Sequence, residues 1–326
     1  MYYSAMKVAV LTSGGDAPGM NAAARAFIRR AIWEGYEAHG IYHGYEGLLA
    51  KEIKKLSSRD VGMIINQGGT FLGTSRSERF KTDEGRQEAA DILKAKKIDA
   101  LCVIGGDGSF RGALNLSEVY KGQIVGIPGT IDNDIPGTEY TIGFDTAVET
   151  AVWAIDKIRD TALAHGRLFL VEVMGRNSGQ IALSVALSCG AEDVVIPEEK
   201  NNIEGMVKRI REGREKGKRF GIIVVAEGHD EGGAIKLAQT MEKDYGLESK
   251  VSILGHIQRG GTPSSYDRVW GSRMGEAAVR FIKNQYTNVF TAMKGGQLVP
   301  AYLKEAVSGI RTVEPEMVQL VRIVGS

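Results

Sequence analysis

Residues 7–35 read KVAVLTSGGDAPGMNAAARAFIRRAIWEG, and this stretch decides the fold class. It begins with a short aliphatic run, 7–11, that has the composition of a buried strand. A turn containing two adjacent glycines follows, and then an alanine-rich segment of helical period that Gly35 terminates. A strand, a turn and a helix in this order form the repeating unit of α/β domains.

The same alternation continues along the 326 residues. Further strands are predicted at 98–104, 123–127, 167–173, 192–197, 220–227 and 250–256. Helices are predicted at 83–97, 109–119, 145–164, 178–189, 203–216, 233–245 and 266–284. This pattern predicts an α/β fold with a largely parallel sheet, and the length together with a turn-rich break near residue 142 predicts a second domain.

Composition excludes several classes of protein. The chain is 43% hydrophobic and 25% charged, as expected of globular domains, and its formal charge of +1 gives no global field for nucleic acid or anionic membranes. Cys102 and Cys189 match no metal-binding spacing, which favours a reducing compartment. The longest apolar runs are too short to span a membrane and the N-terminus does not resemble a signal peptide, so we expect a cytoplasmic protein.

Two glycine-rich turns each follow a predicted strand, where backbone N–H groups can approach an anion closely. The second turn, IGGDGS at 104–109, places Asp107 among three glycines and Ser109 where it is expected to cap the next helix. A carboxylate beside phosphate is suited to Mg²⁺, which binds one or two carboxylates and completes its coordination with water and phosphate oxygens. Such turns are often only tight corners, but two of them with an acid favour a nucleotide phosphate site.

The loop PGTIDNDIPGT, 128–138, carries two carboxylates. Next to bound phosphate and Mg²⁺, Asp132 is placed to accept the proton of an attacking hydroxyl during in-line phosphoryl transfer. Asp134 would hold Asp132 in place or reach the metal. The alternative is that both acids only cap turns, as Asp often does near Pro and Gly.

A third group of residues is cationic and lies at or near the ends of predicted strands. Arg167, Arg176, His256 and Arg259 are suited to a phosphorylated substrate, because guanidinium binds phosphate oxygens through two parallel donors. Glu227 lies nearby at a strand end and would accept from sugar hydroxyls. His256 taken alone is more often a structural histidine.

Seven motifs in this order make the sequence closely resemble the bacterial-type 6-phosphofructokinases over nearly its whole length: LTSGGDAPGMNAA, GGTFLGTSR, IGGDGS, PGTIDND, TIGFDTA, VEVMGR and LGHIQRGG. The resemblance implies two three-layer α/β/α domains, 1–142 plus 257–307 for ATP and 143–256 plus 308–326 for fructose 6-phosphate. It implies a glycolytic, Mg²⁺-dependent homotetramer that transfers the γ-phosphate of ATP to the 1-hydroxyl of fructose 6-phosphate.

The resemblance also implies the role of individual residues. Asp132 would be the proton acceptor, and the other catalytic residues would be Thr130, Asp134 and Arg176. ATP would be held by Gly15, Arg76, Ser77, Gly106, Asp107, Gly108 and Ser109, with Asp107 as the metal ligand. Fructose 6-phosphate would contact Thr130, Ile131, Asp132, Arg167, Met174, Gly175, Arg176, Glu227, Lys250, His256 and Arg259. Arg167 and Lys250 would reach in from a neighbouring subunit, and Lys250 replaces an arginine of the family pattern.

A second anion site is implied between subunits, where ADP would activate and phosphoenolpyruvate would inhibit. Its residues would be Arg25, Arg29, Arg159, Gly190, Glu192, Lys216 and Lys218. Arg25 and Arg29 are one helical turn apart and share a face. The sequence departs from the pattern at Ser58, where arginine is expected, and at Phe220, where histidine can occur. In the alternative interpretation these cations are only solvated.

Two glycines bear on the phosphoryl donor. The pyrophosphate-using branch of the family has GGDDS in the glycine turn and lysine before TIDND, whereas this chain has Gly108 and Gly129 there. ATP is therefore the expected donor, and use of both donors stays open. A lipid or dinucleotide kinase would explain GGDG but not the other motifs, and a non-catalytic sugar-phosphate sensor would not need Asp107 and Asp132 together.

Overall fold

The computed structural model describes residues 5–200, 202–228 and 232–325. The chain forms two compact units. The first comprises the chain up to Ile131, Ile135–Asp145 and Arg259–Ile310, and the second comprises Asp132–Asp134, Thr146–Gln258 and the chain from Arg311 onward. The domain boundaries predicted from the sequence follow residues 142, 256 and 307. In the structure, the corresponding segments of the two units end at Asp145, Gln258 and Ile310. The assignment of one substrate to each domain stays a prediction.

The first unit contains a seven-stranded sheet in the order β11-β10-β5-β4-β1-β2-β3. Its strands are β1 (Lys7–Thr12), β2 (Glu37–Ile41), β3 (Ile53–Lys55), β4 (Ala100–Gly105), β5 (Gln123–Pro128), β10 (Val289–Lys294) and β11 (Gln297–Tyr302). All neighbours are parallel except β2 with β3 and β10 with β11. Of the three central strands, β4 is buried throughout and β1 and β5 are buried after their first residue, as expected for a sheet covered on both faces.

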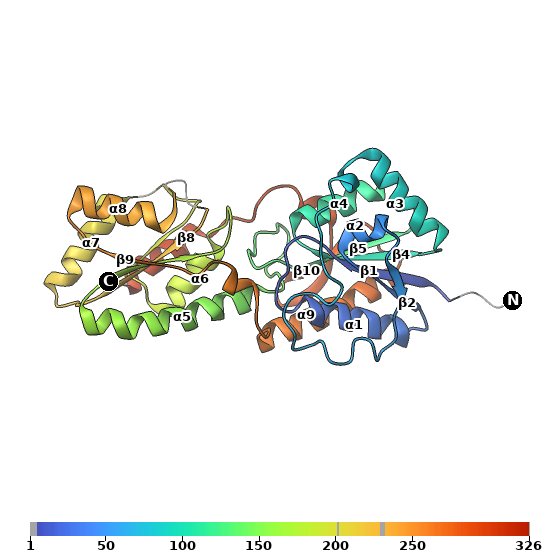
Figure 1. The fold of residues 1–326 in the computed structure, drawn as a ribbon, viewed down its shortest axis with the longest axis horizontal. Coiled ribbons are helices and arrows are strands. Elements are labelled where there is room, and N and C mark those ends of the chain that lie inside the picture. Colours follow the sequence, from blue (N-terminus) through green and yellow to red (C-terminus); the bar gives the residue numbers. More distant parts are fainter. Residues whose placement is uncertain (1–4, 201, 229–231, 326) are drawn as a thin grey trace. The chain divides into compact units, whose positions relative to one another are not determined.

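Helices cover both faces of this sheet. Figure 1 shows α1 (Met20–Trp33) and α9 (Ser265–Lys283) on one face, and α2 (Gly44–Leu49), α3 (Asp83–Ala95) and α4 (Asp107–Ser117) on the other. The short α10 (Leu303–Ala306) contacts α4. Helices α1 and α9 pack with their backbones close together, because a Cβ atom at Gly275 would lie 2.2 Å from the carbonyl oxygen of Ala23.

The second unit has a four-stranded parallel sheet in the order β7-β8-β6-β9. Its strands are β6 (Leu168–Val173), β7 (Asp193–Val195), β8 (Gly221–Ala226) and β9 (Lys250–Ile253). Helices α7 (Ile203–Glu215) and α8 (Gly233–Tyr245) bury apolar side chains against one face. Figure 1 shows α5 (Phe144–His165) and α6 (Gln180–Cys189) on the opposite face. The prediction of two three-layer α/β/α domains with largely parallel sheets is confirmed.

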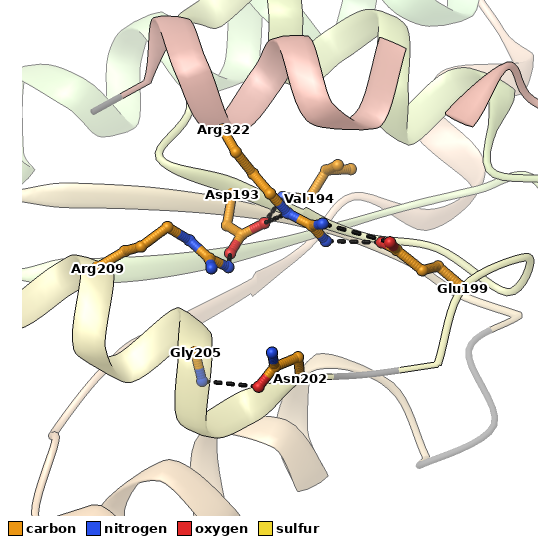
Figure 2. A network of polar contacts seen from close by, with 7 residues as sticks. All are labelled: Asp193, Val194, Glu199, Asn202, Gly205, Arg209 and Arg322. Atoms are coloured by element: carbon orange, nitrogen blue, oxygen red, sulfur yellow. Dashed lines mark hydrogen bonds and ion pairs between the residues drawn. The ribbon is translucent and has the colours of Figure 1, made fainter. Parts of the chain in front are cut away.

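An ion pair joins the last helix of the second unit, α11 (Pro315–Val324), to β7. Asp193 is buried at the start of β7, and Figure 2 shows it between Arg209 of α7 and Arg322 of α11. Arg322 Nε donates to Asp193 at 3.2 Å, and its Nη2 donates to Glu199 at 2.6 Å. A buried carboxylate held by two guanidinium groups has its charge compensated, which makes the docking of α11 specific.

Every strand and helix predicted above is present, with some corrected ends. The strand predicted at 250–256 ends at Ile253, because a 3₁₀ helix, Gly255–Arg259, follows it. Other elements were not predicted: β2, β3, β10, β11, α2, α10, α11 and the 3₁₀ turn Arg79–Lys81. Among the described residues no helix is both long and apolar enough to span a bilayer.

Candidate active site

Three loops meet at the carboxyl edge of the large sheet, after the adjacent strands β1, β4 and β5. The amide of Ser13 donates to the carbonyl of Ile104 at 3.0 Å, and the amide of Gly129 donates to that of Gly105, also at 3.0 Å. Backbone hydrogen bonds therefore hold the starts of the three loops side by side. The carboxyl edge of a parallel sheet is where α/β proteins bind their ligands.

The glycines of the first two loops allow a close approach that side chains would prevent. A Cβ atom at Gly105 would lie 2.4 Å from both the Ser13 carbonyl oxygen and the Ser109 hydroxyl oxygen. Gly14 has a φ of +86° and faces the same hydroxyl. These positions require glycine, and the result is a narrow cradle with Ser109 on one side.

The predicted capping role of Ser109 is wrong. Helix α4 begins two residues earlier, at Asp107, and its N-cap is Gly106 without a side-chain cap. The Ser109 hydroxyl is buried and has no hydrogen-bond partner among the described residues. An unpaired buried hydroxyl in the first turn of a helix is suited to a bound phosphate oxygen.

Asp107 occupies the first position of α4 and is partly exposed. Within the described ranges there is no cluster of three or more His, Cys, Asp or Glu side chains that would enclose a metal. A single carboxylate such as Asp107 would suffice for Mg²⁺, which takes most of its ligands from water and phosphate. The alternative is that Asp107 only complements the dipole of α4.

The GGTFLGTSR loop packs on the first glycine turn. Thr74 donates from Oγ1 to the carbonyl of Gly14 at 2.7 Å, and Thr12 donates to Gly73 at 2.8 Å. The side chain of Arg76 is exposed. The hydroxyl of Ser77 donates to Glu46 and accepts from the amide of Phe80, so it stabilises the local fold of this loop.

Arg259, predicted to bind the sugar phosphate, lies in the first unit against the glycine turn. Its Nη1 donates to the carbonyl of Asp16 at 3.3 Å and would be 2.7 Å from a Cβ atom at Gly15. The guanidinium therefore covers Gly15, where a larger residue would displace it. This contact was not predicted from the sequence.

The two glycines that bear on the donor differ in their surroundings. A Cβ atom at Gly108 would meet nothing within 4 Å, whereas one at Gly129 would lie 2.9 Å from Met20 Cε. Space beside Gly108 is therefore open to a ligand. The position of Gly129 is filled by the protein itself, so a lysine there would require repacking of Met20.

Asp132, Arg176 and Glu227 come together in the second unit. Asp132 is buried, with 2% of its surface exposed, and its Oδ2 lies 3.7 Å from Arg176 Nε. The amide of Arg176 donates to Glu227 Oε1 at 3.1 Å. The hydroxyl of Ser178 donates to the carbonyl of Asp132 at 3.2 Å. The amide of Arg311 donates to the carbonyl of Asp134 at 2.8 Å.

The loop carrying Arg176 has an unusual backbone. Arg176 has a φ of +51° and Gly175 a φ of +146°, both of which L side chains rarely adopt. A Cβ atom at Gly228 would lie 1.4 Å from the Arg176 carbonyl oxygen, so only glycine fits there. Neither Ser178 nor Gly228 was predicted as a site residue, although the glycine after Glu227 was a usable signal.

The LGHIQRGG motif has a buried residue that was not predicted. The side chain of Gln258 is fully buried, accepts from the amide of Met174 at 2.8 Å and donates to the carbonyl of Ala147 at 3.2 Å. It therefore fixes the backbone at Met174, the residue before Gly175. His256, two residues earlier, is exposed in the 3₁₀ turn.

Arg167 and Lys250 lie at one edge of the small sheet. Lys250 begins the edge strand β9, beside Phe169 of β6, and its Nζ lies 2.8 Å from Glu248 Oε1. This hydrogen bond and, more weakly, the charge of Arg167 hold the pKa of Glu248 below its usual range. Both cations are exposed and flank the same carboxylate.

The Phosphofructokinase family profile matches residues 7–282. The chain belongs to the phosphofructokinase family. Two curated relatives are named ATP-dependent 6-phosphofructokinase. The protein from Brevibacillus brevis is 49% identical over 317 residues, which is 97% of this chain and 98% of the relative. The one from Bacillus subtilis is 48% identical over 314 residues, which is 96% of this chain and 98% of the relative.

Solved structures agree with this assignment. The phosphofructokinase from Saccharomyces cerevisiae has a TM-score of 0.86 and 37% identity over 93% of this chain, which spans only 45% of the yeast chain. A pyrophosphate-dependent phosphofructokinase from Marinobacter aquaeolei has a TM-score of 0.83 at 22% identity, over 97% of this chain and 91% of its own. At that identity the likeness shows a shared fold alone.

Three of the predicted effector residues of this phosphofructokinase-family chain, Glu192, Lys216 and Lys218, line a cavity of about 240 Å³ in the second unit. Lys218 Nζ lies 3.7 Å from Glu192, whose pKa is raised by burial against the opposing effect of Lys218. Phe220 also lines the cavity. Of the remaining residues, Arg159 donates to the Cys189 carbonyl and Gly190 ends α6 in the left-handed conformation.

Arg25 and Arg29 lie in the first unit on α1. Their Nε atoms are buried and have no hydrogen-bond partner among the described residues, although Arg29 Nη2 donates to the Ser58 carbonyl at 3.2 Å. Burial, together with the like charge of Arg29, lowers the pKa of Arg25. Two cations that repel each other are stabilised by a bound anion. Ser58 thus contributes its backbone beside these cations rather than a cationic side chain.

Proposed function

We propose that the protein is an ATP-dependent 6-phosphofructokinase, which transfers the γ-phosphoryl group of ATP to the 1-hydroxyl of D-fructose 6-phosphate. The observation that carries the proposal is the buried Asp132 carboxylate, 3.7 Å from the Arg176 guanidinium. The names of the relatives supply the substrates. The proposal is tested by assaying the purified protein with fructose 6-phosphate, Mg²⁺ and either ATP or pyrophosphate.

The geometry supports a role for each side chain in the reaction. The oxygen of the sugar 1-hydroxyl forms a bond to the γ-phosphorus while Asp132 accepts the proton of that hydroxyl. At the same time the bond between the γ-phosphorus and the β–γ bridging oxygen breaks, and ADP leaves. Arg176, whose Nε lies 3.7 Å from Asp132, would face the negative charge of the transferring group. Ser178 fixes the backbone of Asp132. Thr130 and Asp134 flank it as supporting catalytic residues.

The nucleotide would bind at the glycine turns of the first unit, with Gly15, Arg76, Gly106 and Ser109 around its phosphates. Asp107 would hold Mg²⁺. When bound, this ion would neutralise charge on the β- and γ-phosphates. Arg259 is held over Gly15, so it stands beside the nucleotide loop although its assigned partner is the sugar phosphate.

The donor is ATP rather than pyrophosphate in this proposal. The open space at Gly108 admits the additional part of a nucleotide, which a side chain would obstruct. At Gly129 the lysine that the pyrophosphate branch carries would require Met20 to repack. Both observations favour the longer and less compact donor.

The proposed enzyme is a cytoplasmic homotetramer in which Arg167 and Lys250 bind the sugar 6-phosphate across a subunit interface. Within one chain their exposure leaves both side chains available for such a contact. The other proposed ligands of the sugar phosphate, including Ile131, Met174, Gly175, Glu227 and His256, would belong to one subunit.

The proposal includes an effector site for ADP and phosphoenolpyruvate. We expect Arg25→Ala, alone or with Arg29→Ala, to weaken the effector response by roughly 10-fold and to leave saturated turnover nearly unchanged, because effector and substrate sites are coupled only through a conformational equilibrium. Turnover at subsaturating fructose 6-phosphate, titrated with each effector, measures the response.

Lys304→Ala serves as a matched control for these variants, because it removes an exposed cation from the first unit at α10. It should leave the effector response unchanged. An undiminished response in the Arg25 and Arg29 variants would show that these arginines are only solvated charges.

A further inference from the structure

A fully buried carboxylate, Asp267, lies in the first turn of α9, outside every residue discussed so far as binding a substrate. Its Oδ1 accepts hydrogen bonds from the Tyr140 hydroxyl at 2.6 Å and from the Gly143 amide at 2.5 Å. Its position near the N-terminus of a 19-residue helix favours the negative charge. Both donors belong to the segment 138–143.

This segment is attached to the loop that leads into Asp132. The amide of Ile142 donates to the Pro128 carbonyl at 2.9 Å, which extends the sheet by one bridge beyond β5. Thr141 donates from Oγ1 to the Thr130 carbonyl at 2.7 Å. The peptide groups of residues 128–130 are thus held by the same short segment that Asp267 holds from the other side.

The segment also touches the first glycine turn. A Cβ atom at Gly143, whose φ is +104°, would lie 2.6 Å from Ala17 Cβ and 3.3 Å from Ile131 Cγ2. A Cβ atom at Gly19 would lie 2.8 Å from Ile142 Cγ2 and 3.1 Å from Asp267 Cβ. These close approaches place the first glycine turn, the loop 128–138 and the start of α9 around the carboxylate of Asp267.

We propose that Asp267 is a positioning residue for phosphoryl transfer, which sets the backbone of residues 128–130 relative to the glycine turn through Tyr140 and Gly143. The inference rests on the proposed function. Because Asp267 Oδ1 is held by Tyr140 and Gly143, its loss is expected to change the alignment of the reacting groups and to leave their binding chemistry in place. Misplacement by about 1 Å in an active site lowers the rate by up to about 100-fold.

Tyr140 makes the proposal testable without removing the buried charge. Its ring is enclosed by Tyr266 and Trp270, with ring centroids at 5.0 and 6.5 Å. Tyr140→Phe keeps this packing and deletes the hydroxyl that donates to Asp267. Tyr266→Phe removes a hydroxyl from the same aromatic cluster without deleting a donor to Asp267, and is the matched control.

The experiment measures kcat, the two KM values and the melting temperature of four proteins: wild type, Tyr140→Phe, Asp267→Asn and Tyr266→Phe. We expect kcat to fall about 3- to 10-fold in Tyr140→Phe and about 10- to 100-fold in Asp267→Asn, with each KM changed by less than about 3-fold. Tyr266→Phe should match wild type in every quantity.

Two outcomes overturn the proposal. One is a folded Asp267→Asn or Tyr140→Phe with wild-type kcat, which would make the carboxylate purely structural. The other is that in these variants the melting temperature and the fraction of active protein both fall, while kcat per folded tetramer stays at the wild-type value. An inactive wild type would instead refute the proposed function, so the two failures are distinguishable.

Discussion

Asp132→Asn should lower turnover with ATP by at least about 100-fold, because general-base catalysis contributes about 10²- to 10⁴-fold and an amide cannot accept the proton. The substitution preserves the shape of a side chain that is only 2% exposed, and the hydrogen bond from Ser178 to the backbone carbonyl of residue 132 persists. The KM for fructose 6-phosphate should change little, because the proton is transferred mainly in the transition state. Steady-state kinetics at saturating ATP measures both quantities.

Asp160→Asn is a matched control, since it neutralises an exposed carboxylate of α5 in the second unit. It should leave kcat unchanged. Near-normal turnover in an Asp132→Asn protein that melts at the wild-type temperature would remove Asp132 from the role of base.

Lys250→Ala should raise the KM for fructose 6-phosphate by roughly 10- to 100-fold, as expected for the loss of one charge-assisted hydrogen bond to phosphate. The ion pair with Glu248 lies in solvent and holds the ammonium only weakly, so a phosphate dianion can displace it. Lys250→Arg should retain or tighten sugar-phosphate binding, because guanidinium presents two parallel donors. The KM for ATP should stay nearly constant in both variants.

Lys243→Ala, which removes an exposed lysine from the end of α8, is the control for charge in the same unit. Sedimentation of each variant shows whether the tetramer forms, so that an assembly defect is not mistaken for a lost contact. A tetrameric Lys250→Ala with a wild-type KM would refute the contact across the interface.

The parts of the fold that sequence predicted well are those with long periodic signals. Strands such as β4 and β8 are continuous aliphatic runs, and helices such as α5 carry a full amphipathic pattern. The missed strand β3 has only three residues and β11 is mostly half-exposed, so neither has a clear pattern of period two. Helix α11 was missed although Pro315 at its first turn is a recognised start signal.

The candidate site was predictable wherever backbone chemistry dictates the residue. The glycine turns could be identified because only glycine allows such close approaches of the backbone. The loop 128–138 could be identified because two carboxylates in one turn next to a phosphate site favour a catalytic role. Gln258 and Asp267 could not be assigned from sequence, since their function depends on partners more than 80 residues away, Met174 at 84 and Tyr140 at 127. The capping role of Ser109 was mispredicted because a helix end is uncertain by one or two residues without its hydrogen bonds.

The central claim is that this chain transfers phosphate from ATP to fructose 6-phosphate, and one donor assay tests it most directly. Purified protein is mixed with fructose 6-phosphate and Mg²⁺ and supplied with either ATP or pyrophosphate, and fructose 1,6-bisphosphate is measured over time, with Asp132→Asn as the matched blank. The account predicts rapid formation with ATP and at least about 100-fold less with pyrophosphate, a difference of about 2.7 kcal/mol in transition-state stabilisation. Equal or faster formation with pyrophosphate would contradict the donor assignment, and no product with either donor would contradict the proposed function itself.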